Sequence, residues 1–215
     1  MKYKIAHIDE SDQAINQFYH NFKNEFEIVK IKVDSSSEIH TIIDTAISSK
    51  VEAVVVDYLL VEEGEVSFNG NVIFDEFKRI RPHLPIIMLT SYEPEAIDHM
   101  KNVHIVYSKD LMDGESNDEL ELLKTKIKSS ITNYYDLIND TKNEIEFLVK
   151  KRNEKDFSLK EEEELTKKLM LMDELEPEAK EIPSNLIQTE SITKLTDFVA
   201  QTREILEELK KANKK

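Results

Sequence analysis

The segment VEAVVVD at residues 51–57 constrains the fold more than any other part of the sequence, because it is almost entirely apolar and ends in an acid. An apolar run of this length, rich in β-branched residues, is typical of a central parallel strand that is buried on both faces. Four further runs have the composition of strands, at residues 2–8, 27–33, 85–89 and 103–108. Between them lie stretches with helical spacing, at residues 11–24, 38–48, 73–80 and 94–100. This alternation predicts an α/β fold with a five-stranded parallel sheet and right-handed crossovers.

The second part of the chain has a different pattern, because its apolar residues follow long stretches of helical spacing. We therefore expect two domains, at residues 1–115 and 116–215. The segments Ser116–Glu119 and Ser158–Glu161 both have the form of a capping box, which marks the start of a helix.

The first of these helices is predicted to run without a break through Lys151, so that a single helix serves both domains. A second helix follows from Ser158, and a third is predicted over residues 192–209. Their apolar stripes must be buried, either in a hairpin or bundle within one chain or in a coiled coil between two chains. The short connections favour packing within one chain.

The charge balance and composition exclude several classes of function. With 44 Asp and Glu against 29 Lys and Arg, the chain has a net charge of −15 and no net attraction for nucleic-acid phosphates. No apolar run approaches the roughly 20 residues of a membrane span, and the start MKYKIAHIDE has the pattern of a strand rather than a signal peptide. The chain has no cysteine, which excludes disulfides and cysteine nucleophiles. We expect a cytoplasmic protein that binds other proteins, and neither nucleic acid nor membrane.

The residues that carry chemistry stand at the ends of the predicted strands. Asp9 and Glu10 follow the first strand, and Asp57 ends the third. Thr90 follows the fourth strand and Lys109 follows the fifth. The carboxyl ends of the strands in an open parallel sheet form its ligand crevice, so these side chains are predicted to converge there.

The chemistry of this group is consistent with phosphoryl transfer. Asp9, Glu10 and Asp57 supply the oxygen ligands that Mg²⁺ prefers, and a cation would relieve their mutual repulsion. Asp57 can act as a nucleophile toward a phosphoryl group. Lys109 and the metal can neutralise the phosphoryl oxygens, and the Thr90 hydroxyl can donate a hydrogen bond to one of them.

Residues 1–113 resemble the receiver domain of two-component response regulators. The matching segments are IAHIDES, AVVVDYLL, IRPHLPIIMLTSY and VYSKD, which carry the five strand-end residues. The resemblance implies a flavodoxin-like (βα)5 fold and Mg²⁺-dependent phosphotransfer to Asp57 from a histidine kinase or a phosphotransfer protein. It also implies that the backbone carbonyl of Leu59 is a metal ligand, and that phosphorylation shifts the last loops, helix and strand.

Three features depart from the usual receiver pattern. The loop at residues 61–71 is several residues longer, with Asn69-Gly70 at the expected turn. The switch aromatic usually stands three residues before the lysine, whereas here Tyr107 stands one residue nearer and is the candidate. Asp110 replaces the proline that usually follows the lysine. The five chemical positions are all retained.

Three functions compete on this evidence. The first is a phosphorylatable receiver that catalyses only its own phosphotransfer and switches the association of its helical part with itself or a partner protein. The second is an aspartate-nucleophile phosphatase, which usually needs a second aspartate where Leu59 stands, so general acid–base catalysis is lacking. The third is a pseudo-receiver that acts as a scaffold without being phosphorylated.

Overall fold

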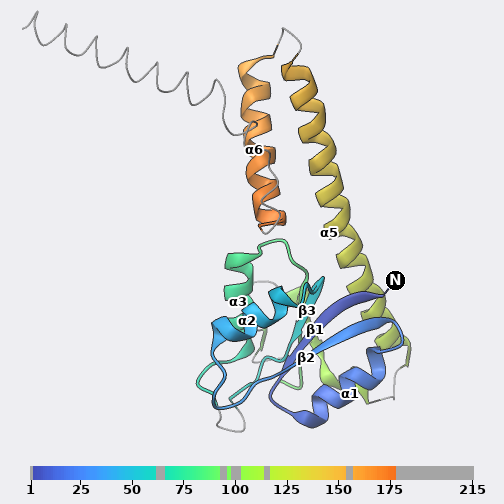
Figure 1. The fold of residues 1–215 in the computed structure, drawn as a ribbon. Helices are drawn as coiled ribbons and strands as arrows, with labels where there is room; N and C mark the ends of the chain where they lie inside the picture. The colour runs from blue at the N-terminus through green and yellow to red at the C-terminus, as the bar shows by residue number, and fades with distance from the viewer. Residues whose placement is uncertain are drawn as a thin grey trace, which may run out of the picture. The chain divides into compact units, whose positions relative to one another are not determined.

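The computed structural model describes residues 2–61, 66–92, 96–97, 103–113, 117–153 and 157–177. The chain divides into two compact units, residues 1–175 and 176–215, and all of the helices and strands given below lie in the first. Its sheet contains the strands β1 (Tyr3–Asp9), β2 (Phe26–Lys32), β3 (Ala53–Val56), β4 (Ile86–Thr90) and β5 (Val106–Ser108). The strands are parallel and lie in the order β2-β1-β3-β4-β5, and the first three of these are labelled in Figure 1. This is the flavodoxin-like order, so the predicted fold class is confirmed.

The core has two layers, one on each face of the sheet. The helices α2 (Ile39–Ser48) and α3 (Gly70–Ile80) pack on the face that contains Val54 and Val56. The helix α1 (Asp12–Phe22) packs on the opposite face, with Ala53 and Val55. Strand β3 is therefore buried on both sides, as its apolar sequence predicted.

Most element boundaries lie within two residues of the sequence prediction, and two differ from it by three residues. The strand predicted over residues 103–108 is shorter, because Val103–Ile105 form a 3-10 helix, η1, before β5 begins. Only Val106–Ser108 pair with β4. The β-branched residues Val103 and Ile105 precede this pairing, and β propensity alone does not make a strand without a partner strand. Helix α3 begins three residues earlier than predicted, since the Gly70 N–H donates to the Tyr58 carbonyl at 2.8 Å. Of the helix predicted over residues 94–100, only 96–97 are described.

After β5, the 3-10 helix η2 (Lys109–Met112) leads toward α5 (Asn117–Arg152), which contains 36 residues. Its first half covers the same face of the sheet as α1. The side chains it buries there are Leu120, Leu123, Ile127 and Ile131. The predicted capping residue Ser116 lies outside the described residues, but the unbroken helix agrees with the sequence analysis.

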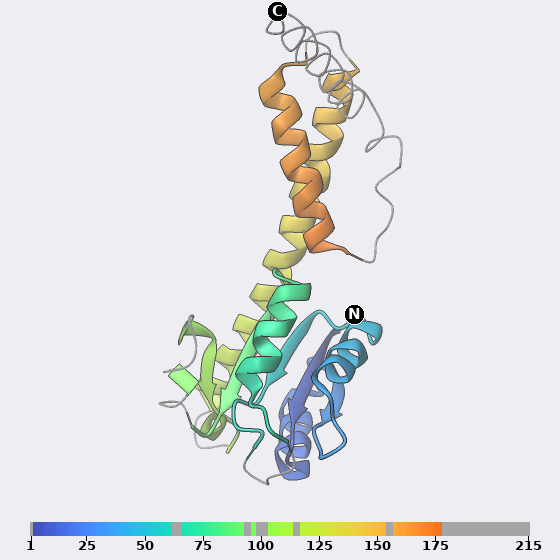
Figure 2. The same ribbon diagram turned by 90° about the vertical axis from the view of Figure 1, so that its left-hand side faces the viewer.

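The second half of α5 forms a hairpin with α6 (Leu159–Leu175), and Figures 1 and 2 show the two helices side by side. Their shared core consists of buried side chains at helical spacing, Tyr134, Ile138, Ile145, Leu148, Leu165, Met172 and Leu175. Ion pairs fix the register, among them Arg152 with Glu162 at 3.2 Å and Lys168 with Glu144. These two helices therefore bury their stripes within one chain.

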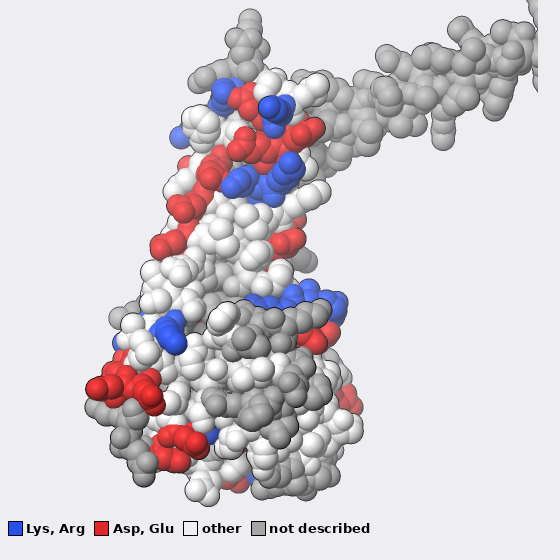
Figure 3. Space-filling view, turned by 180° about the vertical axis from the view of Figure 1, so that it is seen from behind, with Lys and Arg blue, Asp and Glu red and all other residues white. Residues whose placement is uncertain are grey.

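The capping box at the start of α6 forms as predicted. The Ser158 N–H donates to Glu161 Oε2 at 2.8 Å, and the Glu161 N–H donates back to Ser158 Oγ at 3.4 Å. The space-filling view in Figure 3 shows acidic side chains gathered along the hairpin. Over the part of the chain that the structure describes, no helix has the length and apolarity needed to cross a membrane. The third predicted helix, over residues 192–209, lies outside the described residues.

Candidate functional site

The sheet brings four of its strand ends together at one edge. Asp9 is the last residue of β1, and Asp57 directly follows β3, which pairs with β1 in the register Ile8 to Val56. Thr90 ends β4, and Lys109 directly follows β5. The structure therefore places these residues at the carboxyl edge of adjacent strands, where open α/β sheets bind ligands.

The acids and the lysine form a compact buried cluster. Carboxylate oxygens of Asp9, Glu10 and Asp57 all lie within 4.8 Å of one another. Lys109 Nζ lies 2.8 Å from Asp9 Oδ2 and 3.0 Å from Asp57 Oδ2. The exposed fractions are 0% for Asp9, 6% for Glu10 and 3% for Asp57. Because the cluster is this deeply buried, water screens the interactions between its charges little.

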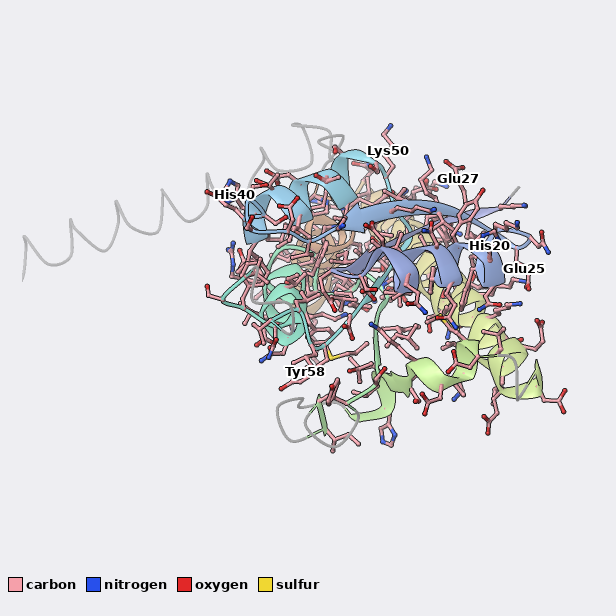
Figure 4. The ribbon with its side chains drawn as sticks, turned by 90° about the horizontal axis from the view of Figure 1, so that it is seen from below. His20, Glu25, Glu27, His40, Lys50 and Tyr58 are labelled. Carbon is pink, nitrogen blue, oxygen red and sulfur yellow. The ribbon has the colours of Figure 1, made fainter. Side chains whose placement is uncertain are left out.

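Backbone contacts hold Asp57 in place. The Asp57 N–H donates to the Ile8 carbonyl at 2.9 Å, which anchors the end of β3 to β1. The backbone carbonyl of Tyr58, a residue labelled in Figure 4, accepts from the Gly70 N–H, so the start of α3 lies against the Asp57–Tyr58 segment. A Cβ atom on Gly70 would lie 1.8 Å from the Asp57 carbonyl oxygen. This approach is possible only for glycine, which explains why Asn69-Gly70 stands at this turn.

Burial and charge shift the titration of the cluster. Burial raises the pKa of Asp57 to about 6, although Lys109 opposes the shift. Burial and the neighbouring Asp9 raise the pKa of Glu10 to about 7. Burial alone would lower the pKa of Lys109, but Asp57 and Asp9 outweigh it and raise that pKa. The lysine is therefore a permanent positive charge beside two carboxyl groups that resist ionisation.

The donor atoms of the cluster fit a hard divalent cation. Among the described residues, Glu10 Oε2 and Asp57 Oδ1 are buried and have no hydrogen-bond donor. Buried carboxylate oxygens without a donor are costly unless a cation binds them, and Mg²⁺ prefers oxygen ligands. The Leu59 backbone acts to lower the pKa of Asp57, against the effect of burial. The role of the Leu59 carbonyl as a ligand stays a prediction.

Thr90 and Tyr107 lie on different sides of this region. Thr90 is fully buried, and its Oγ1 accepts from the Tyr92 N–H at 3.0 Å, which leaves the hydroxyl proton available for another acceptor. Tyr107 packs with the apolar cluster under α5, where Lys126 Nζ lies 4.9 Å from its ring centroid. Tyr107 thus connects β5 to α5, and its role as a switch aromatic remains a prediction.

The sequence analysis did not single out His7, but the structure places it beside the acids. Its ring is fully buried and stacks on Phe18 at 4.0 Å, with Nε2 3.7 Å from Asp9 Oδ2. Burial lowers the pKa of His7 to about 4. The alternation of β1, which puts His7 on the same face as Asp9, is the signal that could have indicated this position.

The fold and this cluster define a flavodoxin-like α/β protein with an acidic site at its strand ends. No protein-family model and no curated protein matches the chain. It is similar to the signal receiver domain of an HD domain-containing protein from Pseudomonas fluorescens, at 14% identity and a TM-score of 0.49, over 62% of this chain and 99% of that chain. It is also similar to a response regulator receiver domain protein from Clostridium thermocellum, at 21% identity, a TM-score of 0.46 and coverages of 61% and 95%. A CheY-like receiver domain protein from Methanospirillum hungatei matches at 16% identity, a TM-score of 0.47 and coverages of 62% and 99%. All three are receiver domains, the class to which the sequence motifs showed a resemblance.

We expect Mg²⁺ to raise the melting temperature much more at about pH 8 than at about pH 5.5. A raised carboxyl pKa means that the folded state binds protons more tightly than the unfolded state. Without metal, Glu10 and Asp57 therefore cost stability as pH rises toward about 7 and about 6, respectively. Above that range their ionised forms repel each other, and a cation relieves the repulsion.

Thermal melts with and without about 10 mM Mg²⁺ measure this difference. A free Mg²⁺ concentration ten times its Kd would stabilise the folded state by about 1.4 kcal/mol. The variant Glu10→Gln is the control, because it removes one ligand charge and should reduce the response at high pH. Equal responses at both pH values would contradict the site.

Proposed function

We propose that this protein is a phosphorylation-dependent signalling protein whose receiver part accepts a phosphoryl group on Asp57. The observation that carries the proposal is the cluster at the strand ends, in which three buried carboxylates and Lys109 meet. A lone acid after a strand is usually a turn former, but this combination supplies a nucleophile, cation ligands and a fixed positive charge together.

In the proposed reaction, an Asp57 carboxylate oxygen attacks the phosphorus of the donor. A bond from that oxygen to phosphorus forms as the bond from phosphorus to the donor's leaving atom breaks, and the leaving group keeps the electron pair. Lys109 offsets the negative charge on the phosphoryl oxygens, and the Thr90 hydroxyl donates to one of them. Mg²⁺, held by Asp9, Glu10, Asp57 and the Leu59 carbonyl, would supply further positive charge when bound.

The resemblance to receiver domains indicates the donor, a histidine kinase or a phosphotransfer protein. Turnover of an external phosphate ester is disfavoured, because an apolar Leu59 stands where aspartate-nucleophile phosphatases usually carry their acid. We place the protein in the cytoplasm, because donors of this class and a chain without cysteine are both compatible with that compartment.

The test is incubation of the full chain with Mg²⁺ and a small acyl-phosphate donor. The expected product is a phosphoprotein that is stable in acid and labile in base, as an acyl phosphate is. Failure of several donors to label the chain would favour the second candidate function, a pseudo-receiver scaffold. Mg²⁺-dependent melting separates a folded but unreactive site from a misfolded protein.

Ion pairs and a hydrogen bond join α5 and the segment before it to the receiver part. Lys128 pairs with Glu25 at 2.5 Å and Lys124 pairs with it at 3.2 Å, which ties α5 to the start of β2 (Glu25 is labelled in Figure 4). Asn21 Nδ2 donates to the Met112 carbonyl at 3.1 Å, so η2 is tied to α1. The first half of α5 and the sheet belong to one apolar cluster, so this half of the helix is packed directly on the sheet.

We further propose that phosphorylation changes the association of the helical part with itself or with a partner protein, without nucleic acid or membrane. Light scattering and partner pull-down should change when the phosphodonor is added to the full chain. A truncation after Asn133 is the matched control, because it keeps Ile131 and the other α5 residues that cover the sheet. If the truncated protein associates identically, the helical part is not the output.

A further inference from the structure

On one side of α5, Tyr135 ties the helix to the amino-terminal edge of the sheet. Its hydroxyl donates to Glu52 Oε1 at 2.5 Å, and Glu52 Oε2 accepts from the Lys4 N–H at 2.7 Å. The Tyr135 ring stacks on Tyr3 with 6.4 Å between centroids, and the Tyr3 hydroxyl lies 3.3 Å from Thr132 Oγ1. Burial and Glu52 raise the pKa of Tyr135, so its phenol stays protonated and remains a donor.

On the other side, Tyr134 ties α5 to the end of α6 and to the loop between α3 and β4. Its hydroxyl donates to the Leu175 carbonyl at 2.5 Å and accepts from Arg81 Nη2 at 3.4 Å. Next to this contact, His83 Nε2 lies 3.1 Å from Glu174 Oε2. The last turn of α6 is thus held against the loop that precedes β4. Tyr134 is 8% exposed, so its hydrogen bonds are shielded from water.

These two neighbours stand where α5 changes partners. The last α5 side chain in the apolar cluster of the sheet is Ile131, and the first in the core of the hairpin is Tyr134. Helix α5 continues unbroken from one cluster to the other, so the contacts made by this turn act on the direction in which the hairpin leaves the sheet. Adjacent residues on a helix point about 100° apart, so two tyrosines can bond in two directions from a single turn.

We propose that the Tyr134–Tyr135 pair is a joint that sets the angle at which the helical hairpin leaves the sheet. The joint lies at the amino-terminal edge, and Asp9 lies at the other end of β1, which spans about 20 Å at the usual rise. The inference deepens the proposed function, because it names the contact that makes the hairpin a rigid extension of the receiver part. Tyr134 and Tyr135 are positioning residues, and their role does not depend on phosphotransfer.

The test measures the orientation of the hairpin directly. Because the chain has no cysteine, spin labels can be attached at two introduced cysteines, Asp44→Cys on α2 and Lys167→Cys on α6, both at exposed positions. Pulsed electron–electron double resonance on the full chain should give one narrow distribution of the distance between the two spin labels. In the double variant Tyr134→Phe, Tyr135→Phe the distribution should broaden about twofold or more, because loss of the two hydroxyl contacts brings neighbouring hairpin orientations close in energy to the parent orientation.

The control is Tyr19→Phe, which removes a phenol hydroxyl from α1 outside the joint and should leave the distribution narrow. All labelled proteins are also measured with Asp57→Asn, so a failure of phosphotransfer cannot be mistaken for a failure of the joint. If the double variant unfolds by circular dichroism, the single variant Tyr134→Phe replaces it, with faster amide exchange in the last turn of α6 as the added readout. An unchanged distribution in a folded joint variant, or a broad one in the parent, overturns the proposal.

Discussion

Phosphoryl incorporation should fall at least about a hundredfold in Asp57→Asn, because an amide oxygen is a far weaker nucleophile than a carboxylate. Asparagine is nearly isosteric with aspartate, so the end of β3 should keep its place beside β1. The substitution also removes one charge from a cluster in which Asp9 helps to raise the pKa of Asp57. The melting temperature without metal should therefore stay equal or rise at about pH 8.

The matched control is Asp110→Asn, which removes an exposed acid next to Lys109. Among the described residues, the ion pairs of Lys109 go to Asp9 and Asp57, so this variant should incorporate phosphate like the parent. Intact mass and base-labile phosphate are measured for both variants. Undiminished incorporation in Asp57→Asn would place the acceptor elsewhere and contradict the assignment.

The strands and the cluster of site residues could be predicted because both depend on local sequence. An acid directly after an apolar strand lies at the carboxyl edge in any parallel sheet, so Asp9 and Asp57 meet once β1 and β3 are neighbours. The same reasoning places Lys109 after β5. The pKa shifts could not be predicted, since they depend on the depth at which Glu10 and Asp57 are buried.

The contacts of the tyrosine pair could not be predicted either, because they join distant parts of the chain. Tyr135 bonds to Glu52, which is 83 positions away, and Tyr134 reaches back 53 positions to Arg81. The helical pattern of α5 indicates only that Tyr134 belongs to an apolar stripe. The side chains that contact Tyr134 depend on the position along α5 at which the sheet ends. The helical periodicity of the sequence does not indicate that position.

Gly70→Ala should destabilise the protein by about 3 kcal/mol, the upper range for an overpacked site. The Cβ would lie 1.8 Å from the Asp57 carbonyl oxygen, 2.8 Å from its carbonyl carbon and 3.1 Å from Val56 Cγ2. Two of these atoms are backbone atoms of Asp57, so relief of the clash requires α3 or Asp57 to move. The expected fall in melting temperature is about 10 °C, at roughly 2–4 °C per kcal/mol for a chain of this size.

The sign of this effect separates a steric clash from helix propensity. Alanine in place of glycine within a helix usually stabilises by up to about 1 kcal/mol, so a loss of stability here must come from the contact with Asp57. The control Val72→Ala, two residues further along α3 and 40% exposed, should change stability by less than about 0.5 kcal/mol. Because Gly70 lies against the backbone of Asp57, the variant should also lose the Mg²⁺-dependent rise in melting temperature. A Gly70→Ala protein that melts above the parent and still responds to Mg²⁺ would show that α3 does not hold Asp57 in place.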